Sequence, residues 1–156
     1  MSSLLQRENQ RSSDSEPLRR SETDEGSIVA SGVFRLARVL FGAVLAFMAT
    51  DNLRNLEGRI QYAESKNAPV PSLSVPAISG GLLFGSLGIA LWRVPAASAA
   101  AVASFFAGVT PLMHDFWNVD DPEEKQQQII EFSKNTALLG AALAFLQLGR
   151  SQNSRE

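Results

Sequence analysis

Two charge-free stretches decide the fold: residues 75–92 read VPAISGGLLFGSLGIALW, and residues 94–113 read VPAASAAAVASFFAGVTPLM. Each is close to the roughly 20 residues that a helix needs to cross about 30 Å of hydrocarbon. Their apolar residues occupy every helical face, whereas a surface helix of a soluble bundle carries charges on one side. Only a short connection around Arg93 separates them. The two stretches therefore predict an antiparallel pair of membrane helices.

Two further candidates flank this pair. Residues 34–50 read FRLARVLFGAVLAFMAT, and residues 129–149 read IIEFSKNTALLGAALAFLQLG. Their few charges lie near one end of each stretch, where long side chains can reach the lipid headgroups. The sequence therefore predicts an all-α integral membrane four-helix bundle in the cell membrane, with spans at roughly 34–50, 75–92, 94–114 and 129–149.

The first 27 residues differ in character from the rest. Arginines, acidic residues and serines alternate there, with almost nothing to bury, which predicts a disordered polar tail. Acidic residues interrupt the place where a signal peptide would need its apolar core, so a cleaved leader is not expected. Partner binding or modification of the tail stays an alternative to a plain solvated segment. We expect one membrane domain over 28–149 and a short polar tail over 150–156.

The composition excludes several classes of site. The 14 basic residues are outnumbered by 16 acidic ones, so nucleic-acid binding has no electrostatic support. The chain has no cysteine and a single histidine, His114. Disulfides, a thiol nucleophile, an Fe–S cluster held by this chain and a haem held by two of its histidines are therefore excluded. No metal site is expected.

Basic residues near the span ends predict the orientation. Seven fall on the side of the termini and five on the opposite side. The first group is Arg19, Arg20, Arg35, Arg38, Arg93, Arg150 and Arg155, and the second is Arg54, Arg59, Lys66, Lys125 and Lys134. Because basic residues are enriched in cytoplasmic loops, both termini are predicted to be cytoplasmic. The loops at roughly 51–74 and 115–128 would then face outward.

Small residues recur at helical spacing within the predicted spans. Gly81 and Gly85 form a GxxxG step, Ser104 and Gly108 repeat the spacing in the next span, and Gly140 lies in a similar series in the last. Membrane helices approach closely across such faces. We expect these residues to pack the helices of one bundle, with a dimer interface as the alternative.

The densest polar cluster lies where the third span ends and the fourth begins. Its members are His114, Asp115, Trp117, Glu131, Lys134 and Asn135. Antiparallel neighbouring helices would bring them together at the outer surface. Histidines titrate near neutrality and a lysine–carboxylate pair can orient a polar group, so the cluster could transfer protons or hold a quinone headgroup. The alternative is interfacial anchoring, with Trp117 in the aromatic belt. Asp51, Asn52, Arg54 and Asn55 could complete the cluster, although nothing in their spacing requires it.

The same region carries a family resemblance. HDFW at 114–117, a polar loop and FSKNTALLG at 132–140 resemble the signature of the DoxX family of small four-helix membrane proteins. RVLFG at 38–42 is similar to the family's first helix, and YAES at 62–65 with PVP at 69–71 to its first outer loop. The resemblance covers about residues 34–148. Ala141 replaces a glycine of the last motif, and the second span lacks the glutamate that many members carry before their glycine pair.

The resemblance implies a redox setting. Members of the family are similar to subunits of quinone-linked oxidoreductases, including thiosulfate:quinone oxidoreductase and a terminal quinol oxidase. It therefore implies an accessory or quinone-contacting subunit of a membrane redox complex, with the lipid bilayer and other redox subunits as partners. The chain alone would bind no redox cofactor other than a quinone, which favours an accessory role over independent catalysis. The alternative is a non-enzymatic transporter or a membrane protein that binds a cargo or partner.

Overall fold

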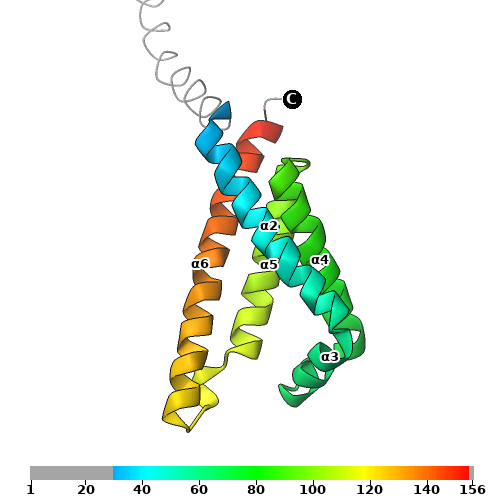
Figure 1. The fold of residues 1–156 in the computed structure, drawn as a ribbon, viewed down its shortest axis with the longest axis vertical. Helices are drawn as coiled ribbons and strands as arrows, with labels where there is room; N and C mark the ends of the chain where they lie inside the picture. Colours follow the sequence, from blue (N-terminus) through cyan, green and yellow to red (C-terminus); the bar gives the residue numbers. More distant parts are fainter. Residues whose placement is uncertain (1–29, 155–156) are drawn as a thin grey trace, which may run out of the picture. The chain divides into compact units, whose positions relative to one another are not determined.

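The computed structural model describes residues 30–154 (Figure 1). The chain divides into two compact units. The first ends at Ala37 and the second begins at Arg38. The elements are α2 (Gly32–Arg54), α3 (Leu56–Ser65), α4 (Pro71–Leu91), α5 (Pro95–Met113), the short 3-10 helix η1 (Phe116–Asn118) and α6 (Pro122–Asn153). The predicted tail at 1–27 and the last two residues lie outside the described part.

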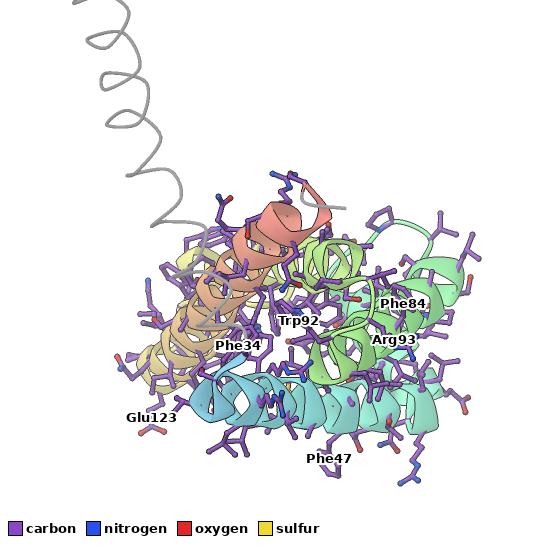
Figure 2. All side chains as sticks on the ribbon, turned by 90° about the horizontal axis from the view of Figure 1, so that it is seen from above. Phe34, Phe47, Phe84, Trp92, Arg93 and Glu123 are labelled. Carbon is purple, nitrogen blue, oxygen red and sulfur yellow. The ribbon has the colours of Figure 1, made fainter. Side chains whose placement is uncertain are left out.

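Four helices are long and apolar enough to cross a membrane. They are α2, α4, α5 with its extension to Asn118, and α6. Large apolar side chains are exposed on the bundle: Phe47 on α2 projects outward in Figure 2 and is 74% exposed, and Phe84 on α4 is 55% exposed. Such exposure is costly in water but natural against lipid. The prediction of an all-helical, four-span, multi-pass membrane protein is confirmed.

Within the first unit, the described residues are the start of α2. The Ser31 hydroxyl oxygen accepts a hydrogen bond from the Phe34 backbone N–H at 3.2 Å. A serine in this position satisfies one of the backbone donors that the first turn of a helix leaves unpaired.

Within the second unit, α5 packs against both α4 and α6. The buried core comes from α2, α4, α5 and α6 and comprises Leu45, Ala49, Leu82, Ile89, Ala99, Val102, Ala103, Phe106 and Ala142. Glycine allows the closest approaches. A Cβ on Gly85 would lie 2.7 Å from the Ser98 carbonyl oxygen, and one on Gly42 would lie 2.8 Å from the Ala90 Cβ. Close backbone contact of this kind is how membrane helices associate.

The turn between α4 and α5 is tight. Trp92 and Val94 adopt left-handed backbone conformations, with φ of 56° and 44°. The Arg93 N–H donates to the Gly88 carbonyl at 2.9 Å, and the buried Ser98 hydroxyl donates to the Arg93 carbonyl at 3.1 Å. The first bond satisfies a carbonyl that the end of α4 would otherwise leave unpaired, and the second satisfies a carbonyl of the turn itself. Pro95 begins α5, where its missing N–H costs nothing.

Trp92 connects this turn to two other helices. Its indole Nε1–H donates to the Gln152 side-chain oxygen on α6 at 2.7 Å. The Arg38 guanidinium on α2 lies 5.7 Å from the centroid of the indole ring, within cation–π distance. Figure 2 shows Trp92 pointing inward among the helices. The indole therefore joins α2, α4 and α6 at this end of the second unit.

The two segments predicted as loops are partly helical. Residues 51–74 contain the end of α2, all of α3 and the first turn of α4, and α6 begins at Pro122, inside the predicted loop 115–128. The Asp121 carboxylate caps α6 by accepting from the N–H groups of Glu123 and Glu124 at 3.1 and 2.8 Å. The sequence DPEE thus starts a helix well before its apolar part, through an N-cap, a proline at the first position and acidic residues in the first turn.

The predicted orientation can be tested by cysteine labelling. Because the chain has no native cysteine, a single Val94→Cys or Asp120→Cys variant carries one reactive site. With both termini in the cytoplasm, a membrane-impermeant maleimide added to intact cells should label Asp120→Cys and leave Val94→Cys unlabelled until the membrane is permeabilised. The reverse pattern would place both termini outside.

Candidate functional site

A cavity of about 330 Å³ opens near the end of the bundle where α5 finishes, and is called the polar cavity below. Its apolar lining includes Val75 and Ile78 of α4, and Phe105, Phe106 and Val109 of α5. Its polar lining comes from five segments of the chain and includes Asp51, Asn52, Arg59, Tyr62, Ser79, His114, Glu131 and Asn135. The volume lies within the about 300–1,000 Å³ typical of small-molecule sites, and a few polar groups in an apolar lining are usual there.

His114 is held in place at the end of α5. Its backbone N–H donates to the Thr110 carbonyl at 3.0 Å. Its ring Nδ1 lies 2.8 Å from the Gln128 side-chain oxygen on α6. A carboxamide can accept or donate according to its orientation, so Nδ1 can pair with Gln128 in either tautomer, and Nε2 is the ring nitrogen left for another molecule. The contact with Gln128 thus ties the ring of the single histidine to α6.

An ion pair lies at the lining formed by α2 and α3. The Arg59 guanidinium contacts the Asp51 carboxylate at 3.0 Å, and the Asn55 amide donates to the other Asp51 oxygen at 2.9 Å. Both ionic side chains are close to half exposed. The pair therefore adds little stability, but it places a cation and an anion at the rim of the cavity.

The Asp115 carboxylate is engaged away from the cavity. It accepts from the Lys66 ammonium at 2.7 Å and from the Asn118 amide at 3.1 Å. The hydrogen bond and charge of Asp115 hold the pKa of Lys66 above its usual value of 10.5, against the opposing effect of burial. The Tyr62 hydroxyl donates to the Met113 carbonyl at 3.3 Å. Together these contacts join the segment from Tyr62 to Lys66 to the end of α5.

The Lys66–Asp115 pair should contribute to stability in a pH-dependent way. Its side chains are only 20% and 22% exposed, and we expect Lys66→Met to lower the free energy of unfolding by about 1 kcal/mol near neutral pH. Because the folded pKa of Lys66 is raised, this contribution is complete below the unfolded pKa and is lost as the pH rises through the folded pKa, above 10.5. Unfolding in detergent micelles, followed by circular dichroism, measures it.

Lys125→Met is the matched control, because Lys125 makes no ion pair among residues 30–154. It should change the unfolding free energy little at any pH. A deficit in Lys66→Met that persisted after deprotonation would show that lost packing, and not the ion pair, is responsible.

Like Asp115, two further predicted site residues lie apart from the cavity. Trp117 is half exposed and packs edge-to-face against Phe116 and Phe132, with ring centroids 5.1 and 6.2 Å away. Lys134 is exposed and pairs with Glu131 on its own helix at 2.8 Å. The aromatic group suits the boundary between lipid and water.

The structure thus divides the six residues of the predicted cluster. His114, Glu131 and Asn135 line the polar cavity, whereas Asp115, Trp117 and Lys134 do not. Asp51 and Asn52, left open by the sequence, also line it. Sequence analysis did not identify Arg59, Tyr62 or Gln128 as site residues. Arg59 and Tyr62 lie on α3, inside the segment that was predicted to be a loop. Recognising that segment as a helix would have been the signal for both residues.

The five predicted packing positions also differ in their surroundings. Gly85 lies directly against α5, and Ser104 lines a second cavity. A Cβ built on Gly81, Gly108 or Gly140 would meet no atom within 4 Å. In the described part of the chain, Gly81 and Gly108 therefore face open space and make no close helix contact there.

No group of three or more His, Cys, Asp or Glu side chains within residues 30–154 could hold a metal ion. The polar cavity offers a different set of polar groups: one imidazole, two carboxamides, two carboxylates and a guanidinium, with aromatic side chains in the same lining. Such groups can hydrogen-bond the polar end of an amphiphilic molecule and can exchange a proton with it.

Comparison with known families agrees with this architecture. The sequence pattern of the DoxX family matches residues 33–115, and that of the HR-like lesion-inducing family matches residues 86–148. No curated protein and no solved structure matches the chain. The DoxX match covers more than half of the sequence and extends from the start of α2 to Asp115, just beyond α5. The chain therefore belongs to the DoxX family of membrane proteins.

Proposed function

We propose that the polar cavity binds a quinone headgroup and that the chain is a quinone-contacting accessory subunit of a membrane redox complex. The observation that supports this is the composition of the cavity: aromatic and aliphatic side chains of the spanning helices line it together with polar side chains from α2, α3, α6 and the end of α5. A quinone has the matching chemistry, because its ring is flat and apolar and its two carbonyl oxygens accept hydrogen bonds.

The polar side chains provide both donors and acceptors. The Asn135 amide and the Arg59 guanidinium can donate to a quinone carbonyl. The Glu131 carboxylate can accept from the hydroxyl of the reduced form. His114 can do either, since Nε2 accepts in one imidazole tautomer and donates in the other. The set can therefore bind both oxidation states and hold a proton next to the ring.

Electrons would have to come from a partner subunit. A bound quinone supplies chemistry in which two electrons and two protons are exchanged. The chain has no cysteine and one histidine, and so cannot by itself hold the Fe–S cluster or doubly His-ligated haem that usually passes electrons to a quinone. The role of its own residues would be to bind, orient and exchange protons.

Direct binding tests the proposal. The protein in lipid nanodiscs should bind duroquinone saturably, above the uptake by empty nanodiscs. Durene, which has the same ring and methyl groups but no carbonyl oxygens, should show no saturable binding, because it offers no acceptor to Asn135, Arg59 or His114. Equal binding of the two compounds, or no saturable binding of duroquinone, would contradict a quinone site.

The accessory role needs a separate measurement. Purification in a mild detergent from native membranes should recover a partner whose absorption spectrum shows haem, flavin or an Fe–S cluster. If no such partner is recovered, and His114→Ala changes solute flux while membrane electron transfer is intact, a transporter or cargo-binding role would replace the redox one.

A further inference from the structure

A second cavity of about 440 Å³ lies beside the polar cavity and is called the apolar cavity below. It is formed mainly by α4 and α5, together with the segment before α4. Apart from the hydroxyls of Ser74 and Ser104, its side chains are apolar. Gly81 and Gly108 line it, and a Cβ on either residue would meet nothing within 4 Å. Glycine here creates space, whereas Gly85 one turn further along α4 permits contact between helices.

The two cavities share one wall. Val75 and Ile78 of α4 and Phe105, Val109 and Met113 of α5 line both of them. The two cavities are therefore adjacent, and only these side chains lie between a polar end near His114 and the apolar cavity. The cavity is also formed by helices that span the membrane, where hydrocarbon is the surrounding medium. An empty space of this size would lose the packing contacts of its lining, so a hydrocarbon chain is its natural occupant.

We propose that the apolar cavity is the tail subsite of the quinone site, and that it holds the first part of a prenyl or alkyl tail whose headgroup occupies the polar cavity. This inference rests on the proposed quinone function. It adds a determinant of ligand preference: quinones with a hydrocarbon tail bind more tightly than their tail-less parents, and the spaces left by Gly81 and Gly108 set how much tail is accepted.

The tail subsite predicts a selective effect of filling the cavity. Wild-type protein in nanodiscs should bind decylubiquinone more tightly than tail-less ubiquinone, with both affinities corrected for partition into empty nanodiscs. Gly108→Leu should place a side chain in the apolar cavity and weaken decylubiquinone binding about tenfold through lost packing contacts. It should leave binding of the tail-less compound unchanged, because Gly108 does not line the polar cavity. Gly81→Leu should act in the same way.

Gly140→Leu is the matched control. Gly140 is also a glycine of a spanning helix with open space at its Cβ, but it lines neither cavity. It should alter neither affinity. Unchanged binding of tail-less ubiquinone also shows that the Gly108→Leu protein is folded.

The possible failures can be told apart. If neither quinone binds the wild-type protein saturably, the proposed quinone function fails and the tail subsite fails with it. If decylubiquinone and tail-less ubiquinone bind wild type with equal affinity, the quinone site stands and the tail subsite is overturned. The same conclusion follows if Gly108→Leu and Gly81→Leu leave the binding of both compounds unchanged, or weaken the binding of both to the same extent.

Discussion

Replacing Gly85 by leucine should destabilise the protein severely, by more than about 3 kcal/mol. A Cβ at this position would lie 2.7 Å from the Ser98 carbonyl oxygen and 2.8 Å from the Val102 Cγ2 atom, both on α5. The first of these is a backbone atom and cannot move without shifting the helix. Leucine would therefore separate α4 from α5, whose contact forms a large part of the buried core.

Unfolding by sodium dodecyl sulfate in mixed micelles, monitored by circular dichroism, measures this loss. Gly140→Leu adds the same side chain to α6 where nothing lies within 4 Å, and should be neutral or slightly stabilising, because leucine favours the helix more than glycine does. Similar stabilities of the Gly85→Leu and Gly140→Leu proteins would show that α4 and α5 are not in the close contact described here.

Replacing His114 by leucine should weaken quinone binding at least about tenfold. The variant removes the ring nitrogen available to the ligand, and a lost hydrogen bond of about 1.4 kcal/mol corresponds to a factor of ten. It also removes the contact between Nδ1 and the Gln128 oxygen, so that α6 is less firmly tied to the end of α5. Titration of the nanodisc-embedded protein with tail-less ubiquinone measures the affinity.

Two further variants show whether the effect is local. Gln126→Leu makes a similar change in size and polarity on an exposed turn of α6 that does not line the cavity, and should bind as wild type does. His114→Gln retains an amide that can donate or accept, and should restore part of the affinity. If His114→Leu bound quinone normally, His114 would be a structural cap of α5 and not a ligand-binding residue.

Much of the fold could be predicted from composition along the chain. The uninterrupted apolar runs on either side of Arg93 are sufficient to predict membrane helices, because the hydrocarbon core sets both their length and their lack of charge. The prolines at 71, 95 and 122 each coincide with a helix start, as expected for a residue that needs no hydrogen-bond acceptor. What was missed is α3, whose short polar sequence LEGRIQYAES has neither the length nor the hydrophobicity of a span.

The site was predicted less completely. His114 and Asn135 could be identified because each is a polar residue next to an apolar span, which is costly unless it is used or satisfied. The sequence alone could not show that Asp115, the neighbour of His114, lies outside the cavity. Its carboxylate is bound by Lys66, which is 49 positions earlier in the chain. That pairing depends on the placement of the segment before α4, which no local pattern encodes.

The glycines show which features the sequence determines and which depend on the tertiary structure. By itself the sequence determined an all-helical, four-span membrane protein and the class of residue that could line its helix contacts, because both follow from local spacing and hydropathy. Only the tertiary structure decided that Gly85 packs against α5 while Gly81, one turn away on the same helix, borders an open cavity. One GxxxG step therefore contains a glycine that contacts a helix and a glycine that borders a cavity. The difference depends on which atoms of α5 lie opposite each glycine, and the residue spacing within α4 carries no information about that.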